Sequence, residues 1–337
     1  MPDVLTSFND RQFQRQVFLP RVNQALAASP LFTSGLLTRN PILDQYAAGT
    51  GLTFTVPVDN ALAAQDQMFG EGDVVQSYGL TGTAQNGVRT LRQTALGYYD
   101  HSAALTGTDP LGKITSDIGA WTTNANAAIV FAVLAGLFGT AGALNDAGHL
   151  VKIASESISG QSAATKFSAA TLLTGAQTAA GQNAGSMSII LCNSYIFLQM
   201  QLSNLVQNVT TVAVGDSKVT FGTWLTYTVV VMDALTSRPG TTDGRVYRSY
   251  VVAPGVLQYG DGLNDKFQAT ETERTPSAAK TKLIYRRGLV VHPTGCSYVN
   301  TPADLSAGPS NTEYATPASW SQVFADSDIK IMAFDTN

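Results

Sequence analysis

The dominant pattern along the chain is a set of apolar residues at helical spacing within residues 109–139. Steps of three and four residues place seven of them on one face of a helix: Leu111, Ile114, Ile118, Trp121, Ala125, Ala128 and Ala132. Asp109 can cap this helix, and Pro110 suits its first turn. Gly136 and Gly139 are expected to end it. The pattern predicts a rod of about eight turns, which favours a mechanical support over a catalytic scaffold.

Alternating apolar positions predict a strand before this helix, at Leu52, Phe54, Val56 and Val58. A second strand pattern covers residues 88–99. The polar, glycine-containing stretch between them, residues 63–87, has little capacity to form a core. Two strands that bracket such a loop predict an extended hairpin that packs on a neighbouring subunit. A disordered surface loop is the alternative.

The N-terminal segment also carries an amphipathic pattern. In residues 8–29, Phe13, Val17, Val22 and Leu26 lie near helical spacing around Pro20. The pattern predicts a short arm that needs a partner surface.

The second half of the chain predicts a small α/β layer followed by strands. Helices are expected at 168–180 and 193–209, on either side of a buried strand at 186–191. The second helix would place Tyr195, Leu198, Leu202 and Leu205 on one side. Strand patterns follow at 219–232, 245–259, 282–291 and 329–334. The fold class predicted is mixed α+β, with strands from both ends of the chain.

Composition narrows the function classes. Charged residues make up 13% of the chain, about half the usual share, which suits a surface made for contact; a neutral-surfaced secreted or environmental protein is the alternative. The net charge of −4 argues against a dedicated nucleic-acid reader. The N-terminal residues do not resemble a signal peptide. The apolar segment 125–138 is too short to span a bilayer, so no transmembrane segment is predicted.

Residues that could carry chemistry are sparse. His101, His149 and His292 are isolated, which argues against a zinc site. Asp261, Asn264, Asp265 and Glu271 could meet a calcium ion, but their spacing departs from an EF-hand loop and favours a plain turn. Cys192 and Cys296 lie in apolar runs and are expected to be buried free thiols. The sequence therefore predicts no catalytic residues, no cofactor and no metal site.

The order of several segments resembles the major capsid proteins of tailed bacteriophages, which have the Hong Kong 97 type fold. The segments that carry the resemblance are GLLTRNPILDQYAAGTGLTFTVPVDNAL at 35–62, residues 89–139 with Trp121 midway, SMSIILCNSYIFLQMQLSNLV at 186–206, TKLIYRRGLVVHPTGCSYVN at 281–300 and the closing residues 318–337 with Trp320. Many relatives have His-Ser where this chain has Asn193 and Ser194. Each motif is weak alone, and their colinear order makes the match specific.

The resemblance implies a division of the chain and a set of partners. Its parts would be an N-terminal arm at 1–47, an extended loop with flanking strands at 48–98, a peripheral domain with the spine helix at 99–150 and 280–337, and an axial domain at 151–279. It implies self-assembly into the hexamers and pentamers of an icosahedral head, in the virion after assembly in the host cytoplasm. The implied partners are a portal protein, a separate or cleaved scaffolding protein, an optional decoration or cement protein, and packaged double-stranded DNA without sequence specificity. No membrane partner is implied.

The interface residues that follow from this picture lie on three segments. They are Phe13 and Val17 on the arm, Met68, Phe69, Glu71, Asp73 and Tyr78 on the extended loop, and Trp121, expected to be buried under the spine helix. Two other functions stay open. An encapsulin-like bacterial compartment shares the fold but carries cargo enzymes, and a soluble carbohydrate-binding or hydrolytic α+β protein would gather acids and aromatics in one cleft.

The sequence also generates a prediction about covalent linkage. Some members of the resembled family join their subunits by an isopeptide bond from a lysine on the extended loop to an asparagine. Residues 50–93 contain no lysine, so no such bond can start from this loop. We expect mature particles to give a single monomeric band on a denaturing gel, and covalent ladders would contradict the prediction.

Overall fold

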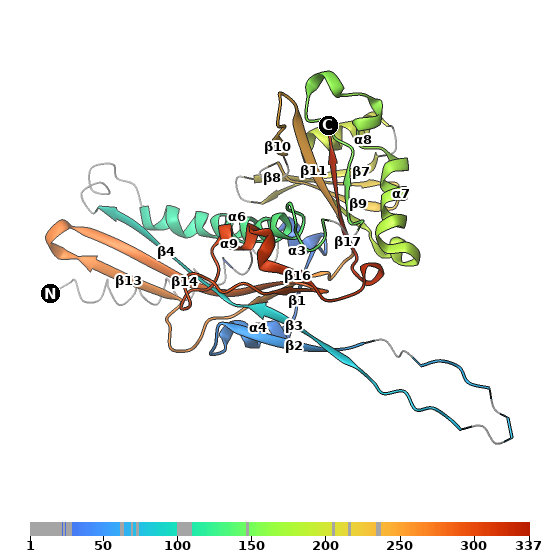
Figure 1. The fold of residues 1–337 in the computed structure, drawn as a ribbon. Coiled ribbons are helices and arrows are strands. Elements are labelled where there is room, and N and C mark those ends of the chain that lie inside the picture. Colours follow the sequence, from blue (N-terminus) through green and yellow to red (C-terminus); the bar gives the residue numbers. More distant parts are fainter. Residues whose placement is uncertain are drawn as a thin grey trace.

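The computed structural model describes residues 22, 24, 29–60, 64–68, 70–71, 74–99, 110–145, 148–203, 206–214, 217–233 and 237–337. Within these ranges the chain has the predicted α+β composition. Figure 1 shows an elongated molecule with a large sheet and its helices at one end and a long strand ribbon at the other. A thin hairpin projects from the body, and one long helix runs along the middle.

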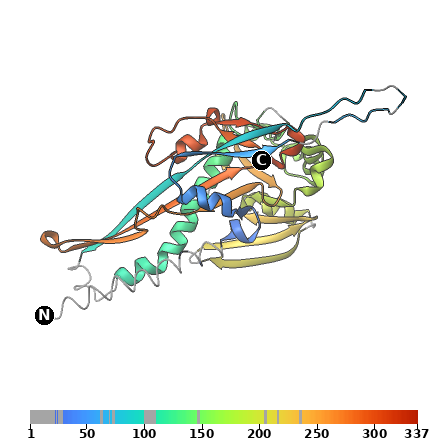
Figure 2. The same cartoon turned by 90° about the horizontal axis from the view of Figure 1, so that it is seen from below.

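The first main sheet is organised around one long strand. Its strands are β1 (Leu37–Arg39), β12 (Leu257–Asp261), β14 (Lys280–Pro293), β13 (Thr270–Thr275) and β4 (Thr90–Tyr99). β14 is 14 residues long and pairs antiparallel with β4, β12 and β13. Together β4, β14 and β13 form the ribbon at one end of the molecule (Figure 2).

The second main sheet has eight strands. They are β5 (Leu150–Lys152), β17 (Ile331–Thr336), β11 (Arg245–Val252), β6 (Ile189–Cys192), β9 (Tyr227–Val231), β8 (Ser217–Trp224) and β7 (Val206–Val214) in this order, with β10 (Ser237–Pro239) paired to β11. Helices α7 (Ala169–Ala180) and α8 (Ser194–Leu202) flank this sheet (Figure 1). Gly175 of α7 lies against Phe334 and Met332 of β17, where a Cβ would come within 2.9 Å of the ring. The closing strand therefore lies inside this layer.

Shorter elements complete the structure. They are α3 (Pro30–Thr33), α4 (Pro41–Ala48), β2 (Thr53–Asp59), β3 (Gly82–Val88), β15 (Cys296–Tyr298), α9 (Asn311–Ala315) and β16 (Trp320–Gln322). β15 pairs with β16 and β2 pairs with β3, each antiparallel. A single large core cluster includes residues from both main sheets and from the long helix.

The long helix α6 spans Pro110–Leu137, 28 residues, as the sequence predicts. The predicted cap Asp109 lies outside the described residues. The expected buried stripe is correct at Ile118 and at Ala132, which is 9% exposed, but it is wrong at Trp121, which is 41% exposed. The buried face instead follows Ile118, Thr122 and Asn126. Polar residues can face inward here because each has a partner: Thr122 donates to Ile118 O (2.8 Å), and Asn126 Nδ2 donates to the Tyr259 hydroxyl (3.2 Å).

Gly136 lies inside α6 and does not end it, contrary to the sequence prediction. A Cβ at this position would lie 2.2 Å from Tyr314 O and 2.6 Å from Trp320 Nε1. Trp320 Nε1 donates to Tyr314 O (2.8 Å), and the Tyr314 hydroxyl bonds Thr90 at the start of β4. Gly136 is therefore needed for the close approach of α6 to α9 and β16.

A buried ion pair joins the end of α6 to the second sheet. Arg248 of β11 contacts both carboxylate oxygens of Asp335 of β17 at 2.6 and 2.7 Å. The same guanidinium donates to Phe138 O, one residue after the helix (3.0 Å). This shared donor fixes the helix end relative to β11 and β17.

Strand pairing differs from the prediction where partners are distant in sequence. The extended hairpin forms between β2 and β3, whereas β4 pairs with β14. The strand expected at 245–259 divides into β11 and β12, which lie in different sheets. The strand expected at 219–232 divides into β8 and β9 around a turn in which Leu225 has a positive φ of 57°.

Two other expectations are altered. The helix at 193–209 ends at Leu202, and its buried side is Ile196, Phe197 and Met200, while Tyr195, Leu198 and Leu202 are exposed. β12 and β13 lie beside β14, and β17 lies beside β5 and β11. The helix at 168–180 and the buried strand near 186–191 are confirmed as α7 and β6.

Within the described residues, one helical segment, Asp117–Leu137, is long and apolar enough to cross a membrane by length and composition alone. Of this segment, 61% is buried inside the fold. Such burial is typical of a core helix. Cys192 and Cys296 are both free and buried, as predicted.

The contact at Gly136 generates a stability prediction. We expect Gly136→Ala to lower the free energy of unfolding by at least about 2 kcal/mol, because the clash with backbone outweighs the gain in helix propensity. Gly185→Ala is the matched control, since a Cβ there meets no atom within 4 Å. Urea unfolding of unassembled protein measures both variants. Equal stability of the two would contradict the close approach.

Candidate assembly surfaces

The root of the β2–β3 hairpin is held by aromatic packing. Phe54 of β2 stacks on Tyr46 of α4, with ring centroids 4.4 Å apart and planes 10° apart. Gly87 is the register partner of Phe54, and a Cβ there would lie 2.2 Å from the Phe54 ring. The ring therefore lies across the β3 backbone, and a glycine is required opposite it.

Hydrogen bonds attach the same root to β14, to the turn after it and to β15. Gln85 of β3 is 2% exposed, and its Oε1 accepts from His292 Nε2 (2.9 Å) and from Gly295 N (3.2 Å). Asn86 N donates to Ser297 Oγ (3.0 Å). Burial lowers the pKa of His292 to about 4, so the imidazole is neutral at pH 7. A neutral ring that donates from Nε2 satisfies the Gln85 amide oxygen.

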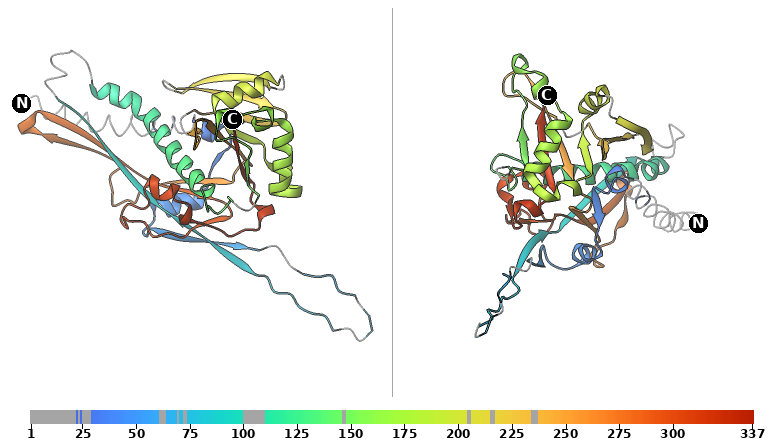
Figure 3. Two further views of the ribbon diagram at one scale, coloured as in Figure 1. Left: turned by 45° about the horizontal axis from the view of Figure 1, so that its top comes forward. Right: turned by 90° about the vertical axis from the view of Figure 1, so that its right-hand side faces the viewer.

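Beyond the root, the hairpin projects into solvent as a two-stranded ribbon (Figure 3). Met68 is 93% exposed, Val74 88% and Val75 74%. Gln67 spans the ribbon: its Nε2 donates to Gln76 O and its Oε1 accepts from Gln76 N, both at 2.8 Å. Large apolar side chains left in water on a projecting element indicate a contact surface.

The structure places the predicted interface residues on separate surfaces. Met68, Glu71 and Tyr78 lie on the projecting loop, and Tyr78 is 39% exposed. Trp121 lies elsewhere, on α6, with the Arg287 guanidinium 5.4 Å from its ring centroid. The remaining four, Phe13, Val17, Phe69 and Asp73, lie outside the described residues. Their interface roles, like those of the described four, stay predictions.

One residue of the predicted arm packs on the chain itself. Val22 is 1% exposed and lies in a cluster with Ile118 of α6 and with Leu283 and Tyr285 of β14. The arm segment thus meets α6 and the long ribbon.

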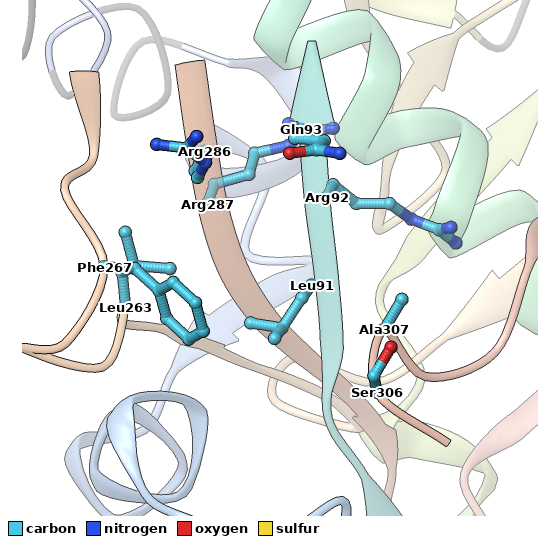
Figure 4. Close-up of a pocket in the computed structure, with 9 residues that line it drawn as sticks. All are labelled: Leu91, Arg92, Gln93, Leu263, Phe267, Arg286, Arg287, Ser306 and Ala307. Atoms are coloured by element: carbon cyan, nitrogen blue, oxygen red, sulfur yellow. The ribbon is translucent and has the colours of Figure 1, made fainter. Parts of the chain in front are cut away.

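A pocket of about 350 Å³ opens on the face of β4 and β14 opposite this cluster. Its lining residues are Leu91, Arg92, Gln93, Leu263, Phe267, Arg286, Arg287, Ser306 and Ala307. Figure 4 shows Phe267 and Leu91 facing one another across the pocket, with Arg286 and Arg287 at one end. Sequence reasoning missed this pocket. The sequence feature that could have indicated the pocket is the presence of two apolar residues, Leu263 and Phe267, in a segment with the composition of a polar turn.

The arginines around this pocket are held by different partners. Arg286 Nη1 contacts Glu271 Oε2 (2.8 Å), and Arg92 Nη2 donates to Pro309 O (2.8 Å) and Asn311 Oδ1 (3.0 Å). Arg287 is 8% exposed and bonds Asn126 of α6. Burial lowers the pKa of Arg287 from its usual value. Each of the three guanidiniums therefore already has a partner within the chain.

The described residues contain no group of three or more His, Cys, Asp or Glu side chains placed to hold a metal ion. His149 and His292 are buried in the fold, and His101 lies outside the described residues. Asn264, considered for calcium, donates instead to Ala48 O at the end of α4 (3.0 Å). His149, His292 and Asn264 therefore have hydrogen-bond partners within the fold.

Comparison with known proteins connects this geometry to a family. No family model matches the chain. The chain is 28% identical over 322 residues to the major capsid protein of Bacillus phage SPP1, covering 95% of this chain and 94% of that protein. The chain is thus similar along nearly its whole length to a phage major capsid protein.

Solved capsid structures share the fold of this chain. The capsid of Ralstonia phage GP4 matches with a TM-score of 0.57 at 10% identity, covering 90% of this chain and 87% of that chain. The acid-stable capsid of Helicobacter pylori bacteriophage KHP30 matches with a TM-score of 0.52 at 12% identity, covering 91% and 90%. The Hong Kong 97 type fold expected from the sequence is confirmed.

The contact between His292 and Gln85 generates a pH prediction. His292 titrates at about 4 in the folded chain and at about 6.5 unfolded. The unfolded chain therefore binds more protons between these values, and stability falls as the pH drops through this window. From pH 7 to pH 5 we expect a loss of about 2 kcal/mol from this group.

His292→Gln tests the assignment, because an amide can donate to Gln85 without titrating. Urea unfolding at pH 7 and pH 5 should show a smaller loss in the variant than in the parent. The same loss in both proteins would show that His292 is not the linked group.

Proposed function

We propose that this chain is the subunit of a tailed-phage head, assembling into the hexamers and pentamers of an icosahedral shell around double-stranded DNA. The observation that carries the proposal is its likeness to a phage major capsid protein along 95% of its length. The projecting loop with exposed Met68, Val74 and Val75 adds a physical reason, because these side chains need a partner chain.

The proposal assigns a role to each part of the fold. In this proposal α6 is the spine, the β2–β3 hairpin is the extended loop, and the eight-stranded sheet forms the axial layer. Portal and scaffolding proteins are the proposed partners during assembly in the host cytoplasm, and packaged DNA is held without sequence specificity. The role is structural and requires no catalysis.

The alternatives are less well supported. An encapsulin-like compartment fits the fold, but the sequence relative described above is a phage protein. A carbohydrate-binding or hydrolytic protein would gather acids in one cleft. The nine residues that line the pocket beside β4 and β14 include no Asp or Glu, and a second pocket of about 400 Å³ is lined by one acid, Asp328.

The proposal is tested by expressing the chain alone and together with a candidate phage scaffolding protein. Negative-stain microscopy and sedimentation should show closed shells or capsomer rings in at least one condition. A homogeneous monomer in both would contradict the proposed function.

A further inference from the structure

The sequence contains a single Asn-Gly pair, Asn86 and Gly87, and the structure places it inside a strand. Such a pair is typical of the turn of a hairpin. Here the two residues lie within β3, where they pair with Thr55 and Phe54 of β2. Glycine is required at position 87 because the Phe54 ring lies against its backbone. The pair therefore serves the packing of the hairpin root and not a turn.

An Asn-Gly pair is also chemically reactive, because glycine has no side chain to shield its backbone nitrogen. The Gly87 nitrogen attacks Cγ of Asn86, and the new C–N bond closes a five-membered imide. The bond from Cγ to the amide nitrogen breaks, and the proton lost by Gly87 leaves with that nitrogen as ammonia. Water then opens the imide at one of its two carbonyls, which leaves aspartate or isoaspartate at position 86.

The folded hairpin root blocks the first step of this reaction. Ring closure requires the Gly87 nitrogen to rotate toward the Asn86 side chain about the Asn86 Cα–C bond, and an extended backbone holds the two groups apart. Asn86 N donates to Ser297 Oγ (3.0 Å), and Thr55 Oγ1 donates to Asn86 Oδ1 (2.9 Å). Asn86 itself is exposed to solvent. The folded root therefore withholds backbone freedom and not access to water.

We propose that Asn86 is a deamidation site that reacts when the hairpin root opens and is protected while the root is closed. Opening must separate Asn86 from Ser297 and Thr55 and lift Gly87 away from the Phe54 ring. The global fold can stay intact during such a local opening. The reaction needs only water, so it proceeds in a free subunit and its test does not depend on the proposed function.

The position of Asn86 determines what the reaction does to the loop. The residue lies between Gln85, which is bonded to His292, and Gly87, which lies against Phe54. Isoaspartate carries the main chain through the former side chain, so it lengthens the β3 backbone by a methylene group between these two attachments. Gln85 and Gly87 then cannot both keep their register with β2. Each event therefore loosens the hairpin irreversibly.

Mass spectrometry of the hairpin peptide tests the proposal. The full-length chain is kept at pH 8 and 37 °C, folded in buffer or unfolded in guanidinium chloride. Cleavage after Arg39 and Arg89 releases residues 40–89 as one peptide, and fragmentation assigns each lost amide to a residue. We expect Asn86 to deamidate in the unfolded chain and about a hundredfold more slowly in the folded chain. Equal rates would overturn the protection, and an intact Asn86 in the unfolded chain would overturn the site.

Ser297→Ala tests whether root opening controls the rate. The variant removes the acceptor of Asn86 N, and we expect it to raise the rate in the folded chain about tenfold. Ser159→Ala is the matched control, because its hydroxyl bonds Ser157 outside the hairpin root, and its rate should stay at the parent value. An unchanged rate in Ser297→Ala would overturn the role of the root.

Two further variants separate local opening from other causes. Gly136→Ala weakens the fold at a contact outside the root, and a larger rise in rate there than in Ser297→Ala would show that the reaction follows global unfolding instead. Asn86→Gln replaces the reactive amide by one that closes a larger ring more slowly. The unfolded Asn86→Gln chain should keep this amide, and ammonia release at the parent rate would place the reaction elsewhere in the chain.

Discussion

The pairing of β14 with three other strands is the interaction on which the structure depends. Its 14 residues join β4, β12 and β13 into one sheet. Its side chains then reach in two directions: Arg287 bonds Asn126 of α6, and His292 holds Gln85 at the hairpin root. One strand therefore sets the relative positions of the spine helix and the projecting loop.

A buried guanidinium imposes a constraint on the helix above it. Arg287 is almost fully covered, and removing a charge from water is costly unless polar groups replace the solvent. The Asn126 amide, the Thr122 carbonyl at 3.3 Å and the Trp121 ring supply them. This explains why Thr122 and Asn126 of α6 face the sheet. Trp121 lies at the edge of this contact and is partly exposed to solvent.

The sequence predicts the local elements of this fold better than their contacts. Helix α6 is predictable because Pro110 and a repeated spacing of three and four both lie within it. The wrong face at Trp121 has a non-local cause, since nothing near residue 121 reveals an arginine 166 positions later. The pairing of β4 with β14 and the split between β11 and β12 are equally non-local. Among the candidate surfaces, the projecting loop was found because its residues cannot form a core. The pocket was missed because four separate segments build it.

The Gln67 side chain gives the loop a property that its composition alone would not. By donating to and accepting from Gln76, it copies the pair of bonds that two facing backbone residues exchange in an antiparallel ladder. The ribbon is thereby held extended before any partner arrives. A segment that is already ordered loses less conformational entropy on docking than a flexible segment does. Part of the conformational entropy that the loop would lose on association is thus already lost in the free subunit. The group responsible is the Gln67 amide, which is uncharged, so salt does not screen its effect.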